Sequence, residues 1–260
     1  MVKTFKYLIL ISISIFILGT LSLKNHFIQD KLLGFAIKSL ATPESNLPKE
    51  DTLTAIVCGS RAPIVDPNRA EACILVQAGD KIFIFDTGDG SVQNLVNWNI
   101  PFDRVKGVFY THLHSDHIAD IGEIHMDTWV AGARKSKLKV YGPEGVQLLT
   151  DGTELAYTND YIFRNEHHGD LLAPLDVVGF DTHTVDLKNP ILIDEDNLKI
   201  TAYSVSHNPV EPALGYRIDY KGRSMSISGD TTYDQNLVKN SKNVDVLFHE
   251  SMSLEILDLI

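Results

Sequence analysis

The stretch Thr111-His-Leu-His-Ser-Asp-His117 carries the most information about the fold of this chain. It places three imidazoles and one carboxylate within six consecutive residues: His112, His114, Asp116 and His117. This donor set suits a borderline metal ion such as zinc, which takes nitrogen and oxygen ligands. The preceding run 105–111 is apolar and rich in β-branched and aromatic residues, so it predicts a buried strand, and 118–132 predicts a helix. The cluster is therefore expected where a strand ends and a helix begins.

The spacing within the cluster predicts how its side chains are used. Residues two apart in an extended chain point the same way. We therefore expect His112 and His114 to converge on one ion, and Asp116 and His117 to turn past it towards a second ion.

Four shorter motifs accompany the cluster along the chain. They are Asp86-Thr-Gly88 after the apolar run 81–85, then Ser206-His207-Asn208, Ser228-Gly-Asp230-Thr231 and Phe248-His249-Glu250-Ser251. Together, and in this order, the five motifs resemble those of the metallo-β-lactamase superfamily, over a region from about residue 53 to the C-terminus. The forms of the third and last motifs are similar to those of the ribonuclease Z and arylsulfatase-like branch.

The resemblance implies an α/β fold, a layered αββα sandwich with the metals at one edge between two sheets. The local patterns agree with strands alternating with helices. Strands are predicted over 52–58, 72–77, 81–85, 105–111, 139–141, 198–205, 213–220, 223–227 and 244–248, and helices over 91–98, 118–132 and 144–161. Residues 158–190 are less regular.

The resemblance also implies a set of metal ligands and their roles. One Zn²⁺ would take His112, His114 and His207, a second would take Asp116 and His117, and Asp230 would bridge the two. Asp116 would also hold the nucleophile, a hydroxide supplied by the metals, and His249 would donate a proton to the leaving group. Asp86 would orient a metal-ligating side chain or its loop without binding the metal itself.

One part of the family pattern has no counterpart in this sequence. The superfamily's final metal-binding histidine normally follows the His249-Glu250 motif, and no histidine follows it here. We therefore expect a C-terminally truncated form of the fold, in which the second of two zinc sites is incomplete.

The N-terminal residues predict export. Lys3 and Lys6 precede an uncharged apolar run over 7–23, which reads as a signal peptide or as an N-terminal membrane anchor, and the sequence leaves both open. Residues 24–50 are expected to form a tether, and 51–260 the hydrolase domain. The protein would then be periplasmic or membrane-anchored, with its N-terminal segment as the contact to the membrane.

The amino-acid composition limits the classes of partner that we expect. The 260-residue chain has a formal net charge of −11, which argues against a nucleic-acid partner and favours a small-molecule substrate. The oligomeric state is not indicated. Cys58 and Cys73 can bridge, but separate buried thiols are the favoured interpretation.

Three functions remain open on these grounds. The first is an exported, metal-dependent hydrolase acting on a small sulfate ester, phosphodiester or lactone. The second is a ribonuclease Z-type endonuclease that processes tRNA 3′ ends, which the motifs favour and the export signal and net charge oppose. The third is a catalytically impaired, membrane-tethered binding protein, which the absent histidine favours.

Overall fold

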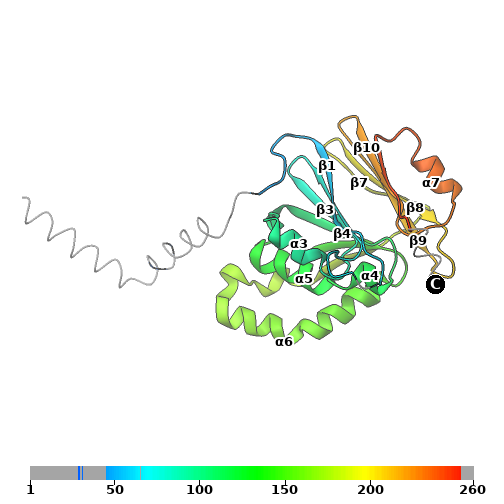
Figure 1. Cartoon of the computed structure of the whole chain (residues 1–260). Coiled ribbons are helices and arrows are strands. Elements are labelled where there is room, and N and C mark those ends of the chain that lie inside the picture. Colours follow the sequence, from blue (N-terminus) through cyan, green and yellow to red (C-terminus); the bar gives the residue numbers. More distant parts are fainter. Residues whose placement is uncertain (1–28, 30, 32–44, 65, 253–260) are drawn as a thin grey trace, which may run out of the picture. The chain divides into compact units, whose positions relative to one another are not determined.

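The computed structural model describes residues 29, 31, 45–64 and 66–252 (Figure 1). The chain divides into two compact units, residues 1–45 and residues 46–260, and the fold described below belongs to the second. The predicted export segment 1–23 and most of the predicted tether lie outside the described residues. Among the residues that are described, no helix is both long and apolar enough to cross a membrane.

Six strands form the first sheet, in the order in which they occur along the chain (Figure 1). They are β1 (Leu53–Gly59), β2 (Cys73–Ala78), β3 (Lys81–Phe85), β4 (Val105–Phe109), β5 (Leu138–Gly142) and β6 (Phe180–Thr184). The first three strands are antiparallel, and β3 to β6 run parallel to one another. The carboxyl ends of β3 and β4 therefore lie at the same edge of the sheet.

Five strands form the second sheet, in the order β11-β10-β9-β8-β7. They are β7 (Ile191–Glu195), β8 (Leu198–Val205), β9 (Ala213–Tyr220), β10 (Arg223–Ile227) and β11 (Val246–Phe248). Neighbouring strands are antiparallel except β10 and β11, which are parallel.

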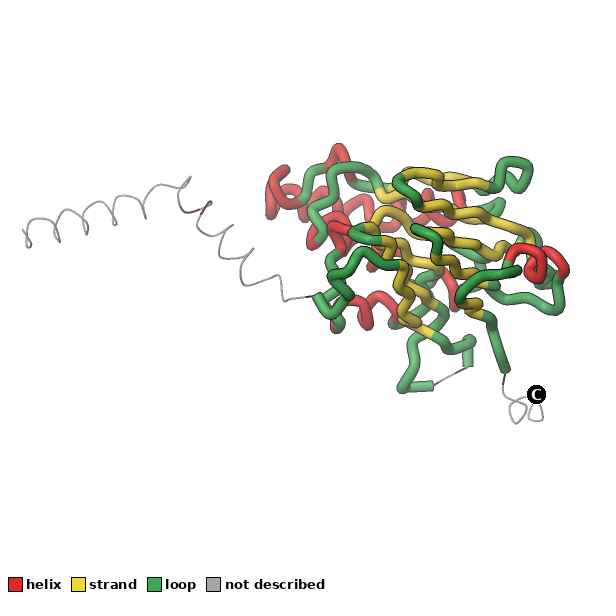
Figure 2. Tube along the Cα trace, turned by 90° about the horizontal axis from the view of Figure 1, so that it is seen from above, coloured by secondary structure: helices red, strands yellow, loops and turns green. Residues whose placement is uncertain are grey.

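The helices lie outside the two sheets. The α-helices are α3 (Ser91–Asn97), α4 (Ser115–Ile118), α5 (Ile121–Met126), α6 (Val146–Leu172) and α7 (Gln235–Asn240). The other helical segments are the 3-10 helices η1 (Phe102–Arg104) and η3 (Leu175–Val177) and the single π turn η2 (Asp127–Ala131). Figure 2 shows most of the helices on one side of the strands and α7 on the other.

Strand β3 shows how the sequence builds two apolar layers. Side chains alternate between the two faces of a strand. Ile82 and Ile84 join the core between the first sheet and its helices, whereas Phe83 and Phe85 join the core between the sheets. The α/β sandwich predicted from the sequence is thus confirmed, with one helical layer on each sheet.

Two strands and part of a helix were not predicted. Strand β6 falls in the segment 158–190 that the sequence indicated as less regular, and β7 follows directly after it. Most side chains of both strands are exposed or only half-buried, so they give no apolar run. Helix α6 continues to Leu172 instead of ending at residue 161, although Gly169 interrupts it with a positive φ of 68°.

The expectation of separate thiols is wrong, because Cys58 and Cys73 form a disulfide with their Cα atoms 5.0 Å apart. Strands β1 and β2 pair in antiparallel register, and a bulge between Val57 and Gly59 brings Cys58 beside Cys73. The sequence alone does not reveal this bulge.

We expect this disulfide to stabilise the domain. In the chain-entropy account, closing a loop of about 15 residues is worth about 3 kcal/mol. The double variant Cys58→Ala and Cys73→Ala should lose stability of that order in urea unfolding followed by circular dichroism. Wild-type protein purified without reductant should show no reactive thiol after denaturation. Two titratable thiols under those conditions would contradict the assignment.

Candidate metal centre

The carboxylate of Asp86 organises the edge of the first sheet. Asp86 follows β3 with a positive φ of 59° and is buried. Its Oδ1 accepts the backbone N–H of Thr111 at 2.8 Å. Its Oδ2 accepts the hydroxyl of Thr111 at 2.8 Å and lies 2.9 Å from Nδ1 of His117. One side chain therefore fixes both the end of β4 and a predicted ligand.

The backbone beside Asp86 touches the helix that carries Asp116 and His117. The N–H of Thr87 donates to the carbonyl of His117 at 2.7 Å, and the N–H of Asp120 donates to the carbonyl of Thr87 at 2.8 Å. A Cβ on Gly88 would lie 2.1 Å from the carbonyl oxygen of Asp116. Only glycine permits this approach, so the Asp86-Thr-Gly88 turn sets the position of α4.

The second sheet is joined to the same point. The N–H of Leu214, near the start of β9, donates to the carbonyl of Thr111 at 2.8 Å. The hydroxyl of Tyr216 donates to the carbonyl of Tyr110 at 2.7 Å. These bonds bring the loops after β8 and β10, which carry His207 and Asp230, to the loop after β4.

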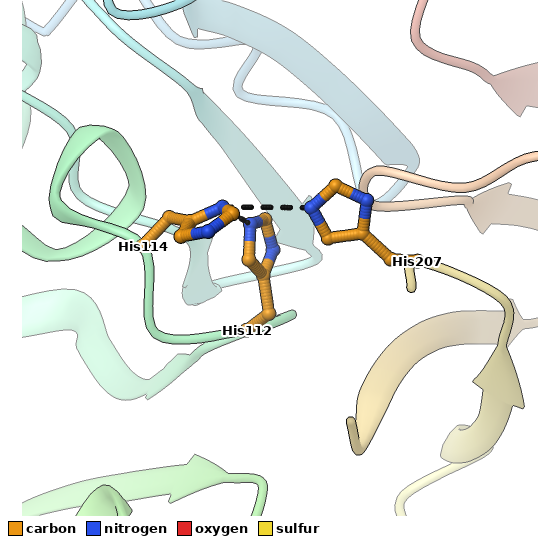
Figure 3. A group of neighbouring side chains, drawn as sticks. All are labelled: His112, His114 and His207. Atoms are coloured by element: carbon orange, nitrogen blue, oxygen red, sulfur yellow. Dashed lines mark hydrogen bonds between the residues drawn. The ribbon is translucent and has the colours of Figure 1, made fainter. Parts of the chain in front are cut away.

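Three imidazoles from both sheets converge on one point. His112 and His114 come from the loop after β4 and His207 from the loop after β8, and Figure 3 shows the rings turned towards one another. Nδ1 of His114 lies 3.0 Å from Nε2 of His112 and 3.4 Å from Nε2 of His207. Two nitrogens bound at 2.0–2.1 Å to a tetrahedral zinc ion lie about 3.3 Å apart, so this geometry fits such an ion.

A second group of donors adjoins the first. It consists of His112, His117 and Asp230, and the candidate ligand atoms of each group lie within 4.8 Å of one another. Nε2 of His117 is 3.6 Å from Oδ1 of Asp230 and 3.7 Å from Oδ2 of Asp116. The structure thus brings all six predicted ligands together, but it pairs His112 with both groups and leaves Asp116 beside the second one.

The carboxylates of the cluster attract positive charge to it. Burial alone would lower the pKa of His117, but the carboxylates of Asp86 and Asp230 outweigh it and raise this pKa to about 10. Burial alone would raise the pKa of Asp230, but His117 holds it below its usual value. Burial and the charge of His117 lower the pKa of His112 to about 3, so its ring stays neutral and offers a lone pair.

The bond between Asp86 and His117 fixes which nitrogen faces the cluster. Oδ2 of Asp86 accepts from Nδ1 of His117, which leaves Nε2 of His117 directed towards Asp116 and Asp230. A carboxylate behind a ligating histidine is the usual means of holding the ring and raising its basicity.

The other predicted residue, His249, lies outside both groups. It is exposed, and its Nδ1 is 2.7 Å from the carbonyl oxygen of Glu250. Its role as a proton donor stays a prediction.

Sequence reasoning missed two positioning residues. Thr111, which is fully buried, links Asp86 to the second sheet and places its hydroxyl 3.1 Å from Nδ1 of His112. Glu250 accepts the N–H of Thr231 at 2.6 Å and so holds the loop that carries Asp230. Both residues stand inside motifs quoted from the sequence, but the sequence alone gave neither of them a role.

Comparison with known proteins agrees with this geometry. The family model described as "Beta-lactamase superfamily domain" matches residues 82–257. The chain is 33% identical to ribonuclease Z of Mycobacterium avium over 204 residues, which are 78% of this chain and 71% of that protein. It is 32% identical to ribonuclease Z of Mycobacterium marinum over 203 residues, which are 76% of this chain and 70% of that protein.

Solved structures show the same fold. The short form of human tRNase Z superposes with a TM-score of 0.59 at 20% identity, over 79% of this chain and 81% of that one. The metallo-β-lactamase fold protein YhfI of Bacillus subtilis superposes with a TM-score of 0.56 at 20% identity, over 76% of this chain and 70% of that one. From the shared motifs, the matched region and these relatives, the chain belongs to the metallo-β-lactamase superfamily, in its ribonuclease Z branch.

Proposed function

We propose that this member of the metallo-hydrolases cleaves phosphodiester bonds with the help of zinc ions held at the cluster. The observation that carries the proposal is the convergence of His112, His114 and His207 beside the group of His112, His117 and Asp230. Divalent ions bound there would supply Lewis-acid activation of water and of the substrate.

The protein's own residues have distinct tasks in this proposal. Asp116 is buried next to His117, so its carboxylate can accept a proton from the attacking water and hold it in line. Asp86 and Thr111 keep the ligand rings in place, and Glu250 does the same for the Asp230 loop. His249 is proposed to protonate the leaving oxygen.

The comparisons favour tRNA as the substrate. The relatives at 32–33% identity are named ribonuclease Z, and they support the tRNA 3′-processing interpretation better than a small ester. The sequence-based expectation against a nucleic-acid partner rested on net charge alone, and these relatives weigh against it.

A small, exported substrate is the second candidate, and the disulfide favours it. Disulfides persist mainly in oxidising compartments outside the cytosol, where tRNA maturation does not occur. The basic side chains at the far end of the second sheet also give little free positive charge. Lys199, Arg217, Lys221 and Arg223 each lie within ion-pair distance of an aspartate.

Metal content is the first test. Wild-type protein should bind zinc, and His114→Ala should lose most of it because one nitrogen of the first group is gone. The control is His183→Ala, a histidine on β6 outside both groups. Elemental analysis after dialysis gives the stoichiometry and shows whether the second group binds more weakly, as expected. A metal-free wild type would favour the binding-protein interpretation instead.

Asp116→Asn should reduce turnover far more than it affects folding. Loss of the proton acceptor is worth about 10²–10⁴-fold in kcat. Asparagine preserves the side-chain volume, so the thermal midpoint of the metal-free variant should stay close to that of the wild type. Asp181→Asn on β6 is the control and should keep wild-type turnover. Undiminished activity of Asp116→Asn would remove this residue from the mechanism.

The two substrates are separated by a direct comparison. The purified protein is assayed on a precursor tRNA and on bis(p-nitrophenyl) phosphate, with an aryl sulfate and a lactone alongside, and a reporter is fused after residue 50. The tRNA interpretation expects cleavage at the tRNA 3′ end and a cytoplasmic reporter. The second candidate expects turnover of a small ester only and an exported reporter. No hydrolysis of any of them by zinc-loaded protein would overturn the proposed activity.

A further inference from the structure

Asp120 is a buried carboxylate one helical turn beyond the metal-binding loop. It follows His117 by three residues, and the residue after α4 is still helical, with φ −55° and ψ −42°. Asp120 is only 6% exposed. Burial raises the pKa of Tyr110, and the charges of Asp86 and Asp120 add to that rise, so both carboxylates lie near this one hydroxyl. Asp120 is therefore close to the metal centre without belonging to either donor group.

The side chain of Asp120 caps a helix that is distant in the sequence. Its Oδ2 accepts the backbone N–H of Val92, in the first turn of α3, at 3.0 Å. Gly90, at the N-cap position of α3, has no side chain that could accept this bond. The bond requires an oxygen acceptor but not a negative charge, since aspartate and asparagine are about equally good caps. The substitution Asp120→Asn would therefore preserve it.

The negative charge of Asp120 is unfavourable for the metal-free fold. Burial is the largest cause that raises the pKa of the Asp120 carboxyl from 3.8 to about 6, and Glu123 and Asp89 add to the rise. The backbone N–H groups of Ser91 and Val92 act in the opposite direction. Because the folded protein holds this proton more tightly than the unfolded chain does, ionisation of Asp120 reduces stability. The loss is absent below about pH 4 and complete above about pH 6.

The side chains around Asp120 do not neutralise its charge. Asp86, by contrast, lies 2.9 Å from the ring of His117. The charged side chains that act most strongly on Asp120 are both acidic: Glu123 on α5 and Asp89 in the loop before α3. A divalent ion at the metal centre would supply positive charge, because charges inside a protein interact over longer distances than charges in water.

We propose that the ionised carboxylate of Asp120 strengthens cation binding at the metal centre, although the same charge weakens the metal-free fold. This role presupposes the zinc centre of the proposed function and adds a residue outside its ligands. Residues that serve an active site often reduce the stability of the fold. A merely structural role for Asp120 would change stability and zinc affinity in the same direction, whereas the proposed role changes them in opposite directions.

The first test measures zinc affinity at neutral pH by competition with a chromophoric chelator. Asp120→Asn should raise the zinc dissociation constant severalfold, because it removes a negative charge near the divalent ion. The matched control is Asp127→Asn, which removes another carboxylate whose pKa is raised by burial. Asp127 lies about 10 Å further along the helical segment of α5 and η2, so its substitution should leave the zinc dissociation constant unchanged.

The second test uses the metal-free protein, so it does not depend on zinc. At neutral pH, Asp120→Asn should unfold at a higher urea concentration than the wild type, because the neutral amide replaces a buried charge and keeps the bond to Val92. The difference between the two midpoints should shrink as the pH falls through about 6 and should vanish near about pH 4, where Asp120 of the wild type is protonated.

The outcomes separate this role from the proposed function. An Asp120→Asn variant that fails to fold, or that loses stability and zinc affinity together, would show a structural role alone and overturn the proposal. A wild type that binds no zinc would overturn the proposed function as well. Zinc binding by the wild type that Asp120→Asn leaves unchanged would overturn the role of Asp120 and leave the proposed function standing.

Discussion

The carboxylate of Asp86 is the constraint on which the metal centre depends. Its two oxygens accept from the backbone and hydroxyl of Thr111 and contact the ring of His117. Because both oxygens are engaged, the carboxylate has one position, and the end of β4 and the His117 ring are fixed relative to β3. A buried carboxylate is stable only when it is paired in this way. Asp86 therefore depends on Thr111 and His117 as much as they depend on Asp86.

Thr111 extends this constraint from one sheet to the other. Its amide and hydroxyl belong to the first sheet, and its carbonyl accepts from Leu214 of the second. The stacked rings of Phe85, Phe109 and Tyr141 fill the space below, with Tyr216 packed across them. Because the two sheets are held together at this edge, metal-binding side chains from loops far apart in sequence lie close to one another.

Sequence alone predicts the parts of this centre that are local. His112, His114, Asp116 and His117 are close in the chain, so their spacing is sufficient. Asp86, His207 and Asp230 lie far from one another in sequence, and only the order of family motifs joined them. Strands β6 and β7 were missed because exposed edges give no apolar pattern, and the disulfide because a bulge is invisible in sequence. His112 belongs to both donor groups because of how the chain turns after β4, and the residue types do not specify that turn.

The Cys58–Cys73 bond has a consequence for how the protein tolerates damage. It closes residues 58–73 into a covalent ring, and about half of the ring's described residues are exposed. The same ring carries Glu71, which is paired with Arg61 and lies against Gly88. A protease that cuts the ring at an exposed site such as Ile64 leaves both new ends tied to the domain. The two fragments of a nicked chain therefore stay joined by the Cys58–Cys73 bond, with Arg61 on one fragment and Glu71 on the other.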